Sequence, residues 1–296
     1  MKKMISHIAL FCLCIVALLP LRVLYVVSDA TYFLLYYIIR YRRKVVRTNL
    51  INSFPEKTEA EIRSIERKFY LHLCDCIYET IKLLHISDKE MRKRAVIVNA
   101  ELVEKIAATG KPIILFIAHY GNWEWVQEIT LRYKYPKTNV AVYKKIHNPI
   151  SAKVVEKMRL RYASSCIIIP QAETLRTILK LKQQGEPFVA GLIADQRPPR
   201  FHQKLWITFL NQHTPLLTGG EDIGKRIGAH FLYLDVDKTR RGHYTMEFKD
   251  ISTDESIEEY PYTIGYFRML EQSIRRRPEL WLWSHKRWKY AVTNPQ

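Results

Sequence analysis

Six short apolar runs constrain the fold of this chain more than any other feature of its sequence. All six lie beyond residue 96, and they read PIILFIAH, NVAVYKK, CIIIP, PFVAGLIAD, HFLYLDVD and YTMEFKDI. Several are apolar at successive positions, as strands are when both faces of a sheet are covered. Helix-length segments separate several of the runs. The pattern therefore predicts an α/β fold in which helices flank a central, mostly parallel sheet.

A helical lead-in precedes these runs. Pro55 and Thr58 are start signals for a helix, and an amphipathic segment follows them. Its apolar positions recur every three or four residues: Ile62, Ile65, Phe69, Leu73, Cys76 and Ile77. Because this spacing matches one face of a helix, the sequence predicts a helical segment over residues 55–95 and an α/β core over residues 96–296.

An uncharged apolar stretch opens the chain. Residues 4–21 carry no formal charge, and the apolar character resumes beyond Arg22 as far as Ile39. About 20 apolar residues cross a bilayer as a helix. The basic run RYRRKVVR follows at residues 40–47, and such a run marks the cytoplasmic flank and attracts anionic lipid. We therefore expect a membrane-anchoring helix with a basic flank within residues 1–45.

A cleavable signal peptide is the competing interpretation of this stretch. Lys2 and Lys3 precede the apolar residues, and Ser28-Asp29-Ala30 resembles a cleavage site. A second, Tyr-rich apolar stretch and the basic run follow that site, which favours the anchor. The expected arrangement is a single domain over residues 46–296 that stays on the cytoplasmic side of the membrane.

The charge of the chain predicts an anionic partner. The 47 Lys and Arg residues exceed the 29 Asp and Glu residues by 18, which suits nucleic acid, an acidic membrane surface, or an acidic protein or phosphorylated substrate. From Arg275 on, basic residues are interleaved with Trp281, Trp283, Trp288 and Tyr290. Single-stranded nucleic acid and a membrane interface both fit this mixture. The apolar N-terminal stretch favours the membrane, so we expect no nucleic-acid partner.

One His-x4-acid spacing lies where an α/β fold exposes reactive groups. The spacing itself occurs at three places: His85/Glu90, His119/Glu124 and His230/Asp235. About one match arises by chance from the composition, so the context must separate them. His119 ends the run PIILFIAH and the turn signal Gly121-Asn122 follows, as at the strand ends where reactive side chains are exposed. His85 and His230 are better explained as ordinary polar residues.

His119 and Glu124 together suit general-base chemistry. A carboxylate beside a histidine fixes the tautomer of the ring and stabilises the imidazolium, so the ring can take a proton from a hydroxyl group. The same residue types also bind metal ions. However, the sequence has neither an HExxH motif nor His and Cys residues clustered at ligand spacing. We therefore expect no metal site.

The segment AHYGNWE resembles the His-x4-Asp/Glu motif of the late acyltransferases of lipid A assembly, the lauroyl and myristoyl transferases related to lysophospholipid acyltransferases. The likeness extends over most of the chain. It includes RKVVRTNLINSFPEKTEAE, VYKKIHNP followed by MRLR, ADQ at residues 194–196, and PELWLWSHKRWK. The order and spacing of these segments are specific as a set. The resemblance implies an enzyme of the inner membrane whose catalytic domain lies on the cytoplasmic side.

The resemblance also implies the reaction and its residues. The expected enzyme is an O-acyltransferase that moves a fatty acyl group from acyl carrier protein to a hydroxyl of a glycolipid, a lipid A precursor, beside anionic membrane lipid and without a further cofactor. His119 would be the general base and Glu124 its carboxylate partner. Arg159 in MRLR would present a fixed cation to an acidic group. Asp195 and Gln196 would belong to the substrate site.

Some features leave the substrates open. Tyr143-Lys144-Lys145 stands where the family often has Tyr-Arg-Pro, and Tyr162-Ala163-Ser164 stands where it has a Gly-rich tail.

Asn122 is a candidate to polarise the thioester carbonyl, and residues 197–214 form either a border of the acceptor site or an irregular surface loop. The same chemistry on an aminolipid or phospholipid remains an alternative, as does a non-catalytic basic protein that binds membrane surfaces or nucleic acid.

Overall fold

A seven-stranded sheet forms the centre of the protein. The computed structural model describes residues 11–143, 155, 157, 158, 166–251, 253, 254 and 256–289. The strands of the sheet are β1 (Ala95–Ile97), β2 (Ile113–Ile117), β3 (Thr138–Tyr143), β4 (Ile167–Pro170), β5 (Phe188–Ile193), β8 (His230–Arg240) and β9 (His243–Asp250). Their order is β1-β9-β8-β2-β5-β3-β4. All six apolar runs of the sequence are therefore strands.

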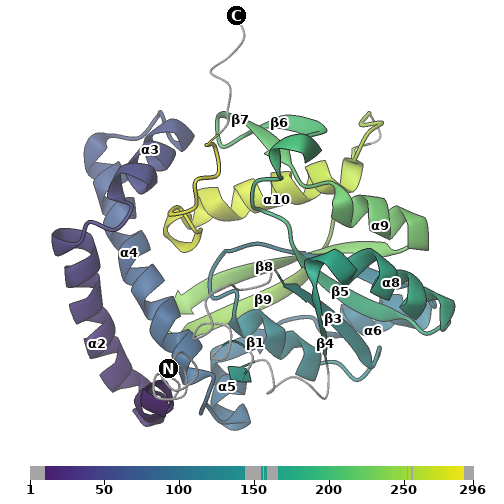
Figure 1. Cartoon of the computed structure of the whole chain (residues 1–296), viewed down its shortest axis with the longest axis horizontal. Helices are drawn as coiled ribbons and strands as arrows, with labels where there is room; N and C mark the ends of the chain where they lie inside the picture. The colour runs from purple at the N-terminus through teal and green to yellow at the C-terminus, as the bar shows by residue number, and fades with distance from the viewer. Residues whose placement is uncertain are drawn as a thin grey trace, which may run out of the picture.

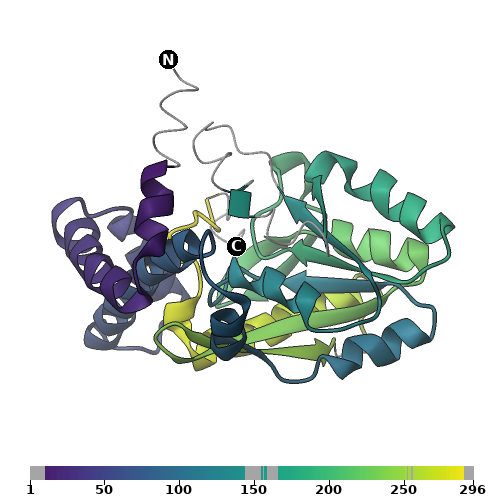
Figure 2. The ribbon, with the colours of Figure 1, turned by 90° about the horizontal axis from the view of Figure 1, so that it is seen from below.

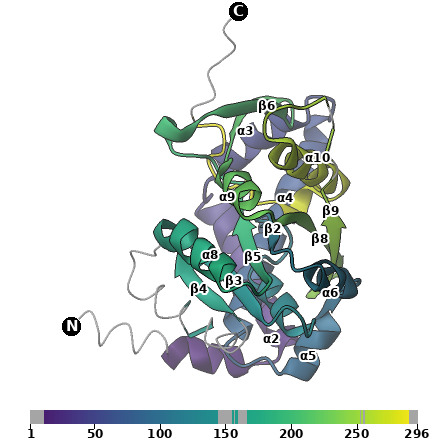
Figure 3. The same ribbon diagram turned by 90° about the vertical axis from the view of Figure 1, so that its right-hand side faces the viewer.

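The sheet is mostly parallel. Strands β8, β2, β5, β3 and β4 run in one direction, whereas β9 is antiparallel to β8, and β1 pairs in parallel with β9. All five residues of β2 are buried. Helices cover both faces of the sheet, with α8, α9 and α10 on one face and α6 on the other (Figure 3). These helices are α6 (Glu101–Ala108), α8 (Thr174–Gln183), α9 (Gly219–Ile227) and α10 (Pro261–Arg276). The predicted α/β class and the flanked, mostly parallel sheet are confirmed.

The described residues of the N-terminal third of the chain are mostly helical and pack at one end of the sheet (Figure 1 and Figure 2). Its elements are α2 (Leu21–Phe33), the π-helix η1 (Leu34–Ile38), α3 (Arg43–Ser53), α4 (Glu59–Lys82) and α5 (Asp88–Arg94). A capping box between Thr58 and Glu61 starts α4, because the two side chains satisfy N–H groups that the first turn leaves free. The strands β8, β2 and β5 direct their carboxyl ends toward α4.

Helix α2 lies along α4 and is joined to it by polar contacts. The Tyr25 hydroxyl donates to Glu79 Oε1 at 2.9 Å, and the Ser28 hydroxyl donates to Asp75 Oδ1 at 2.9 Å. Because residue numbers rise along α2 as they fall along α4 in these pairs, the two helices are antiparallel. Helix α2 is therefore part of the folded domain on one side.

The opposite side of the N-terminal helix is apolar and exposed. Val26 is 69% exposed, Phe33 56% and Ile38 64%. By length and composition, Leu21–Ile38 is the helical stretch of the described residues that could cross a membrane. Exposed apolar surface of this extent is typical of sites that meet a membrane or a protein.

Part of residues 197–214, for which an irregular surface loop was one expectation, forms a hairpin. The hairpin consists of the antiparallel strands β6 (Leu205–Phe209) and β7 (Gln212–Leu216), and a 3-10 turn, η4 (Arg200–His202), precedes it. Leu210 and Asn211 form the connection, with φ of 50° and 59°. Two residues with positive φ match the twist of a tight hairpin. The usual glycine signal is missing here, so the sequence pattern did not indicate it.

Candidate functional site

The sheet register places His119 beside Asp195. Ile117 at the end of β2 pairs with Ile193 at the end of the neighbouring parallel strand β5. His119 and Asp195 each follow two residues later, so both leave the sheet at the same edge. His119 Nδ1 lies 2.7 Å from Asp195 Oδ1, and the backbone N–H of His119 donates to Asp195 Oδ2 at 3.0 Å.

Asp195 is held as a carboxylate. Its residue is 2% exposed, and Trp281 Nε1 donates to Oδ2 at 2.9 Å. Burial alone would raise the pKa of Asp195, but the His119 charge and the hydrogen bonds from His119 and Trp281 lower it overall. An ionised carboxylate only accepts hydrogen bonds. The Nδ1 atom of His119 must therefore carry the proton, which leaves the lone pair of a neutral ring on Nε2.

The Nε2 atom of His119 is positioned to accept a proton. Burial lowers the pKa of His119, but the charge and hydrogen bond of Asp195, together with the charge of Glu124, outweigh this effect and raise it. Gln196 Nε2 lies 3.2 Å from His119 Nε2, where its amide can donate to the lone pair. Trp123 packs against the imidazole with the ring centroids 5.5 Å apart. A hydroxyl that replaced the Gln196 amide would meet the base directly.

A tight turn after His119 fixes the ring relative to the rest of the chain. Gly121 has a φ of +63°, and a Cβ atom there would come within 2.7 Å of Val236 Cγ1, so glycine is required on both counts. The C-terminal segment is paired with this turn. Gly121 N donates to Leu280 O at 3.0 Å, and Leu282 N donates to His119 O at 3.1 Å. The turn is thus held by residues far away in sequence.

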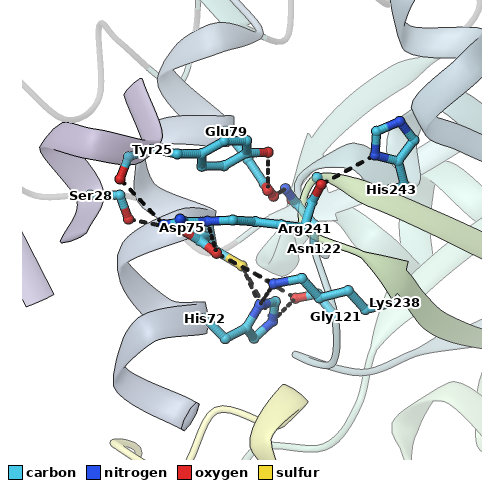
Figure 4. Close-up of polar contacts among 12 residues, drawn as sticks. Tyr25, Ser28, His72, Asp75, Glu79, Gly121, Asn122, Lys238, Arg241 and His243 are labelled. Atoms are coloured by element: carbon cyan, nitrogen blue, oxygen red, sulfur yellow. Dashed lines mark hydrogen bonds and ion pairs between the residues drawn. The ribbon is translucent and has the colours of Figure 1, made fainter. Parts of the chain in front are cut away.

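Asn122 and Glu79 support the turn from within the core (Figure 4). Asn122 Nδ2 donates to Glu79 Oε2 at 2.6 Å, and Asn122 Oδ1 accepts from Trp125 N at 3.2 Å. Asn122 is 1% exposed. Its amide therefore serves the protein's own turn, whereas the sequence analysis proposed that it polarises a thioester carbonyl.

Glu79 is a residue of this site that the sequence analysis missed. It is 0% exposed, and besides Asn122 it accepts the hydroxyl groups of Tyr25 at 2.9 Å and Tyr244 at 2.8 Å. Burial raises the pKa of Glu79 above its ordinary value. The available signal was a glutamate two positions after the apolar Ile77 on an amphipathic helix, which sequence alone does not separate from a solvated position.

The other predicted residues lie in different surroundings. Glu124 is half-buried and acts on His119 through its charge, whereas the carboxylate that is hydrogen-bonded to the ring is Asp195. Arg159 lies outside the described residues. Among the chance matches, His85 is exposed beyond the end of α4, and His230 pairs with Asp250. In the described part of the chain, no group of three His, Cys, Asp or Glu side chains is arranged to hold a metal ion.

An apolar cavity of about 110 Å³ adjoins Glu124. Strands β2, β3, β4 and β5 and the 3-10 helix η2 (Trp125–Leu131) supply most of its wall. Its apolar lining includes Ile117, Ile129, Val140, Val142, Ile168 and Ile193. The site therefore combines a fixed histidine with an adjoining apolar space.

Several of the C-terminal basic and aromatic residues are buried, although a surface position was expected for them. They were predicted to form a membrane-interface surface, but Trp281 is 3% exposed, Trp283 0% and Arg287 1%. Trp281 binds Asp195, and the Arg287 guanidinium donates to Pro215 O at 2.6 Å. The prediction was wrong for these residues because their aromatic rings complete the core beside the site.

Comparison with known proteins identifies the family. The family model described as bacterial lipid A biosynthesis acyltransferase matches residues 1–290. The chain belongs to this family. The match includes the N-terminal helices, His119, Asp195 and the C-terminal segment that carries Trp281, and it confirms the resemblance found in the sequence. A comparison with curated proteins finds no match to the chain.

Membership in the lipid A acyltransferase family gives the site its chemical class. An acyltransferase of lipid A biosynthesis needs a group that activates an acceptor and a place for an acyl chain. His119 with Asp195, and the apolar cavity beside Glu124, are the candidates for these two parts. The site described above is therefore the candidate active site of the acyltransferase.

Proposed function

We propose that this acyltransferase moves a fatty acyl group from an acyl carrier protein thioester to a hydroxyl of a lipid A precursor, with His119 as the general base. The observation that carries the proposal is the His119–Asp195 contact of 2.7 Å. It directs the protonated Nδ1 into the protein and leaves Nε2 as the basic atom. General bases on enzymes commonly use a histidine oriented in this way.

The proposed reaction uses this one basic atom twice. His119 Nε2 takes the proton of the acceptor hydroxyl while the oxygen attacks the thioester carbonyl carbon, and the carbonyl electrons move onto oxygen. The carbon–sulfur bond of the resulting tetrahedral intermediate then breaks. The carrier thiolate leaves and takes the proton from the His119 imidazolium, so the ester forms and the base is regenerated. Asp195 stabilises the imidazolium throughout.

The two carboxylates near His119 have different proposed roles. Asp195 is hydrogen-bonded to the ring and orients it, whereas Glu124 adds a second negative charge from the edge of the apolar cavity. Both charges favour the imidazolium. Gln196, whose amide points at Nε2, would occupy the place of the acceptor hydroxyl until the substrate arrives.

The donor and the location follow from apolar surface and charge. The apolar cavity beside Glu124 suits an acyl chain. A formal charge of +18 suits an acidic carrier protein and anionic lipid. The exposed apolar side of α2 and η1 would hold the enzyme on the inner membrane, with the catalytic domain on the cytoplasmic side.

The decisive experiment supplies the purified full-length protein with acyl carrier protein thioesters of several chain lengths. Acceptors are a lipid A precursor, an aminolipid and a phospholipid, and products are identified by mass spectrometry. We expect an ester on the lipid A precursor and weaker donor saturation as ionic strength rises, since exposed charge pairs are screened beyond about 10 Å at 0.1 M salt. Acylation of the aminolipid or phospholipid instead would reject the lipid A precursor as the acceptor, and no transfer from any of the carrier protein thioesters would reject acyl carrier protein as the donor.

A further inference from the structure

A second cavity, of about 350 Å³, lies beside the turn that follows His119. Helices α2 and α4, the hairpin between β8 and β9, and the 3-10 turn η5 (Pro278–Leu280) contribute its wall. His72 on α4 lines it and also contacts Gly121 O at 3.2 Å. None of the lining residues belongs to the His119–Asp195 pair or to the apolar cavity.

Positive charge predominates around this cavity. The cationic side chains come from three separate parts of the chain: Lys68, Lys238, Arg240, Arg241 and Arg277. The carboxylates of the wall are Asp29, Asp75 and Glu279. Burial lowers the pKa of His72 well below its ordinary value, so this ring is neutral. Five cations against three carboxylates leave an excess of two positive charges.

The carboxylates of the wall are already engaged. Arg241 bridges Asp29 and Asp75, with a shortest distance of 2.6 Å to each. Lys238 Nζ lies 3.4 Å from Asp75 Oδ2. Arg277 Nε donates to Glu279 Oε1 at 3.0 Å. Figure 4 shows the contacts of Asp75 with Arg241 and Lys238. These pairs neutralise three of the five cations.

Lys68 and Arg240 supply the remaining charge. Neither forms an ion pair with a carboxylate of the described residues, and both are exposed. Arg240 Nη2 contacts His243 Nε2 at 3.1 Å. Burial lowers the pKa of His243, so the neutral ring can accept this contact but does not neutralise the charge of the guanidinium. Two cations from different elements that face one hollow repel each other. An anionic group between them would relieve this repulsion.

The neighbouring surface indicates that the anion is attached to a lipid. Asp29 forms one edge of the cavity from α2. Val26 and Phe33 lie three residues before and four residues after it, so they share its side of the helix. They are 69% and 56% exposed. A lipid with its chains against this apolar side would place its headgroup at the basic cavity.

We propose that the cavity between α2, α4 and the β8–β9 hairpin binds the phosphate-bearing headgroup of an anionic membrane lipid. Lys68 and Arg240 would contact the phosphate, while Lys238, Arg241 and Arg277 hold the wall together. This site depends on the proposed membrane association but not on acyl transfer. It would fix the orientation of the domain on the membrane surface and place the turn after His119 at a defined height.

Binding of soluble lipid analogues tests the site. Full-length protein in a nonionic detergent is titrated with short-chain phosphatidylglycerol, with the matching phosphatidylcholine, and with inorganic phosphate at constant ionic strength. The test variant is Lys68→Gln with Arg240→Gln. The control variant removes the same charge from exposed lysines at the far end of the molecule, Lys105→Gln on α6 with Lys182→Gln on α8. Thermal unfolding checks that each variant is folded.

We expect phosphatidylglycerol to bind more tightly than the other two probes. The test variant should weaken its binding about 30-fold, because each basic residue beside an anionic lipid is worth roughly fivefold. The control should change it less than about twofold, because exposed charges beyond a Debye length of about 8 Å are screened. Equal weakening by both variants would reject the site. Inorganic phosphate that binds as tightly as phosphatidylglycerol would assign the cavity to a soluble anion instead. No acyl donor is present, so neither outcome bears on the catalytic proposal.

Discussion

Two buried carboxylates support the segment that carries His119, and their partners differ. Asp195 is 2% exposed and Glu79 is 0% exposed. Asp195 contacts the imidazole of His119, a group that can become positively charged, whereas Glu79 accepts hydrogen bonds from the neutral side chains of Tyr25, Asn122 and Tyr244. The pKa of Asp195 is lowered and that of Glu79 is raised.

This difference separates a carboxylate that acts by its charge from one that acts by its shape. The charge of Asp195 stabilises the protonated form of His119, which proton transfer requires. Burial of Glu79 disfavours its charged form, and its oxygens fix the positions of the surrounding donors. We therefore expect changes that remove only charge to be severe at Asp195 and mild at Glu79.

The largest effect is expected for His119→Ala, which removes the proposed proton acceptor. General-base assistance is worth ~10²–10⁴-fold in rate, so the turnover measured with carrier thioester and lipid acceptor should fall by at least this factor. The controls His85→Ala and His230→Ala should keep their activity, because neither residue lies at the site. Near-normal turnover by folded His119→Ala protein would contradict the mechanism.

Asp195→Asn should come next, with a loss of at least ~10²-fold, because it removes the charge that stabilises the imidazolium. The double variant with His119→Ala should lose little more than His119→Ala alone, since residues that act as one unit are not additive. The pH dependence of the residual activity should also change. Asp195 raises the pKa of His119, and the base works only when neutral. Without this charge, the acid limb of kcat/KM should move to lower pH.

Glu124→Gln should have a smaller effect, roughly tenfold in kcat/KM, because it removes only the weaker of the two negative charges that favour the imidazolium. Its acid limb should also move to lower pH, but by less than for Asp195→Asn, because Glu124 is the last and smallest of the influences on His119. The pH dependence of kcat/KM, measured for both variants, gives these two shifts. A loss as large as that of His119→Ala would instead make Glu124 the principal partner of the base.

Glu79→Gln should have the smallest effect, with activity within about threefold of the unchanged protein, because the amide keeps one acceptor oxygen and can donate to the Tyr25 hydroxyl. Folding raises the pKa of Glu79. The protonated Glu79 side chain therefore contributes to stability at low pH, and this contribution is lost as pH rises through the pKa of Glu79 in the folded state. Thermal unfolding across pH should show this dependence in the unchanged protein and lose it in the variant. Glu79→Ala is the control for shape, and it should lower both stability and activity, since it leaves buried donors unpaired.

The sheet could be predicted because helices cover both of its faces, which makes several of its strands, such as β2 and β5, continuous apolar runs. Even so, β1 was missed, since its three residues are too few to form a pattern. The β6–β7 hairpin was missed for another reason. Its connection uses Leu210 and Asn211 at positive φ, a conformation that a leucine does not indicate.

His119 could be predicted from its place at a strand end, and the same signal was available for Asp195. Ile117-Ala118-His119 and Ile193-Ala194-Asp195 end two apolar runs in the same way. Only the parallel register makes these two ends neighbours. Glu79 and Trp281 could not be assigned in this way, because their contacts depend on how distant elements pack and not on local spacing.

The pairing of the C-terminal segment with the turn after His119 has a consequence for the timing of biosynthesis. Trp281 follows His119 by 281 − 119 = 162 residues, and it donates a hydrogen bond to Asp195. At ~5–20 residues per second, a ribosome needs roughly 8–30 seconds to make this stretch. The N-terminal helix can meet a bilayer during that interval, before Asp195 has its last donor. A nascent chain would therefore reach the membrane as an inactive precursor and acquire a complete catalytic centre only after Trp281 has been made.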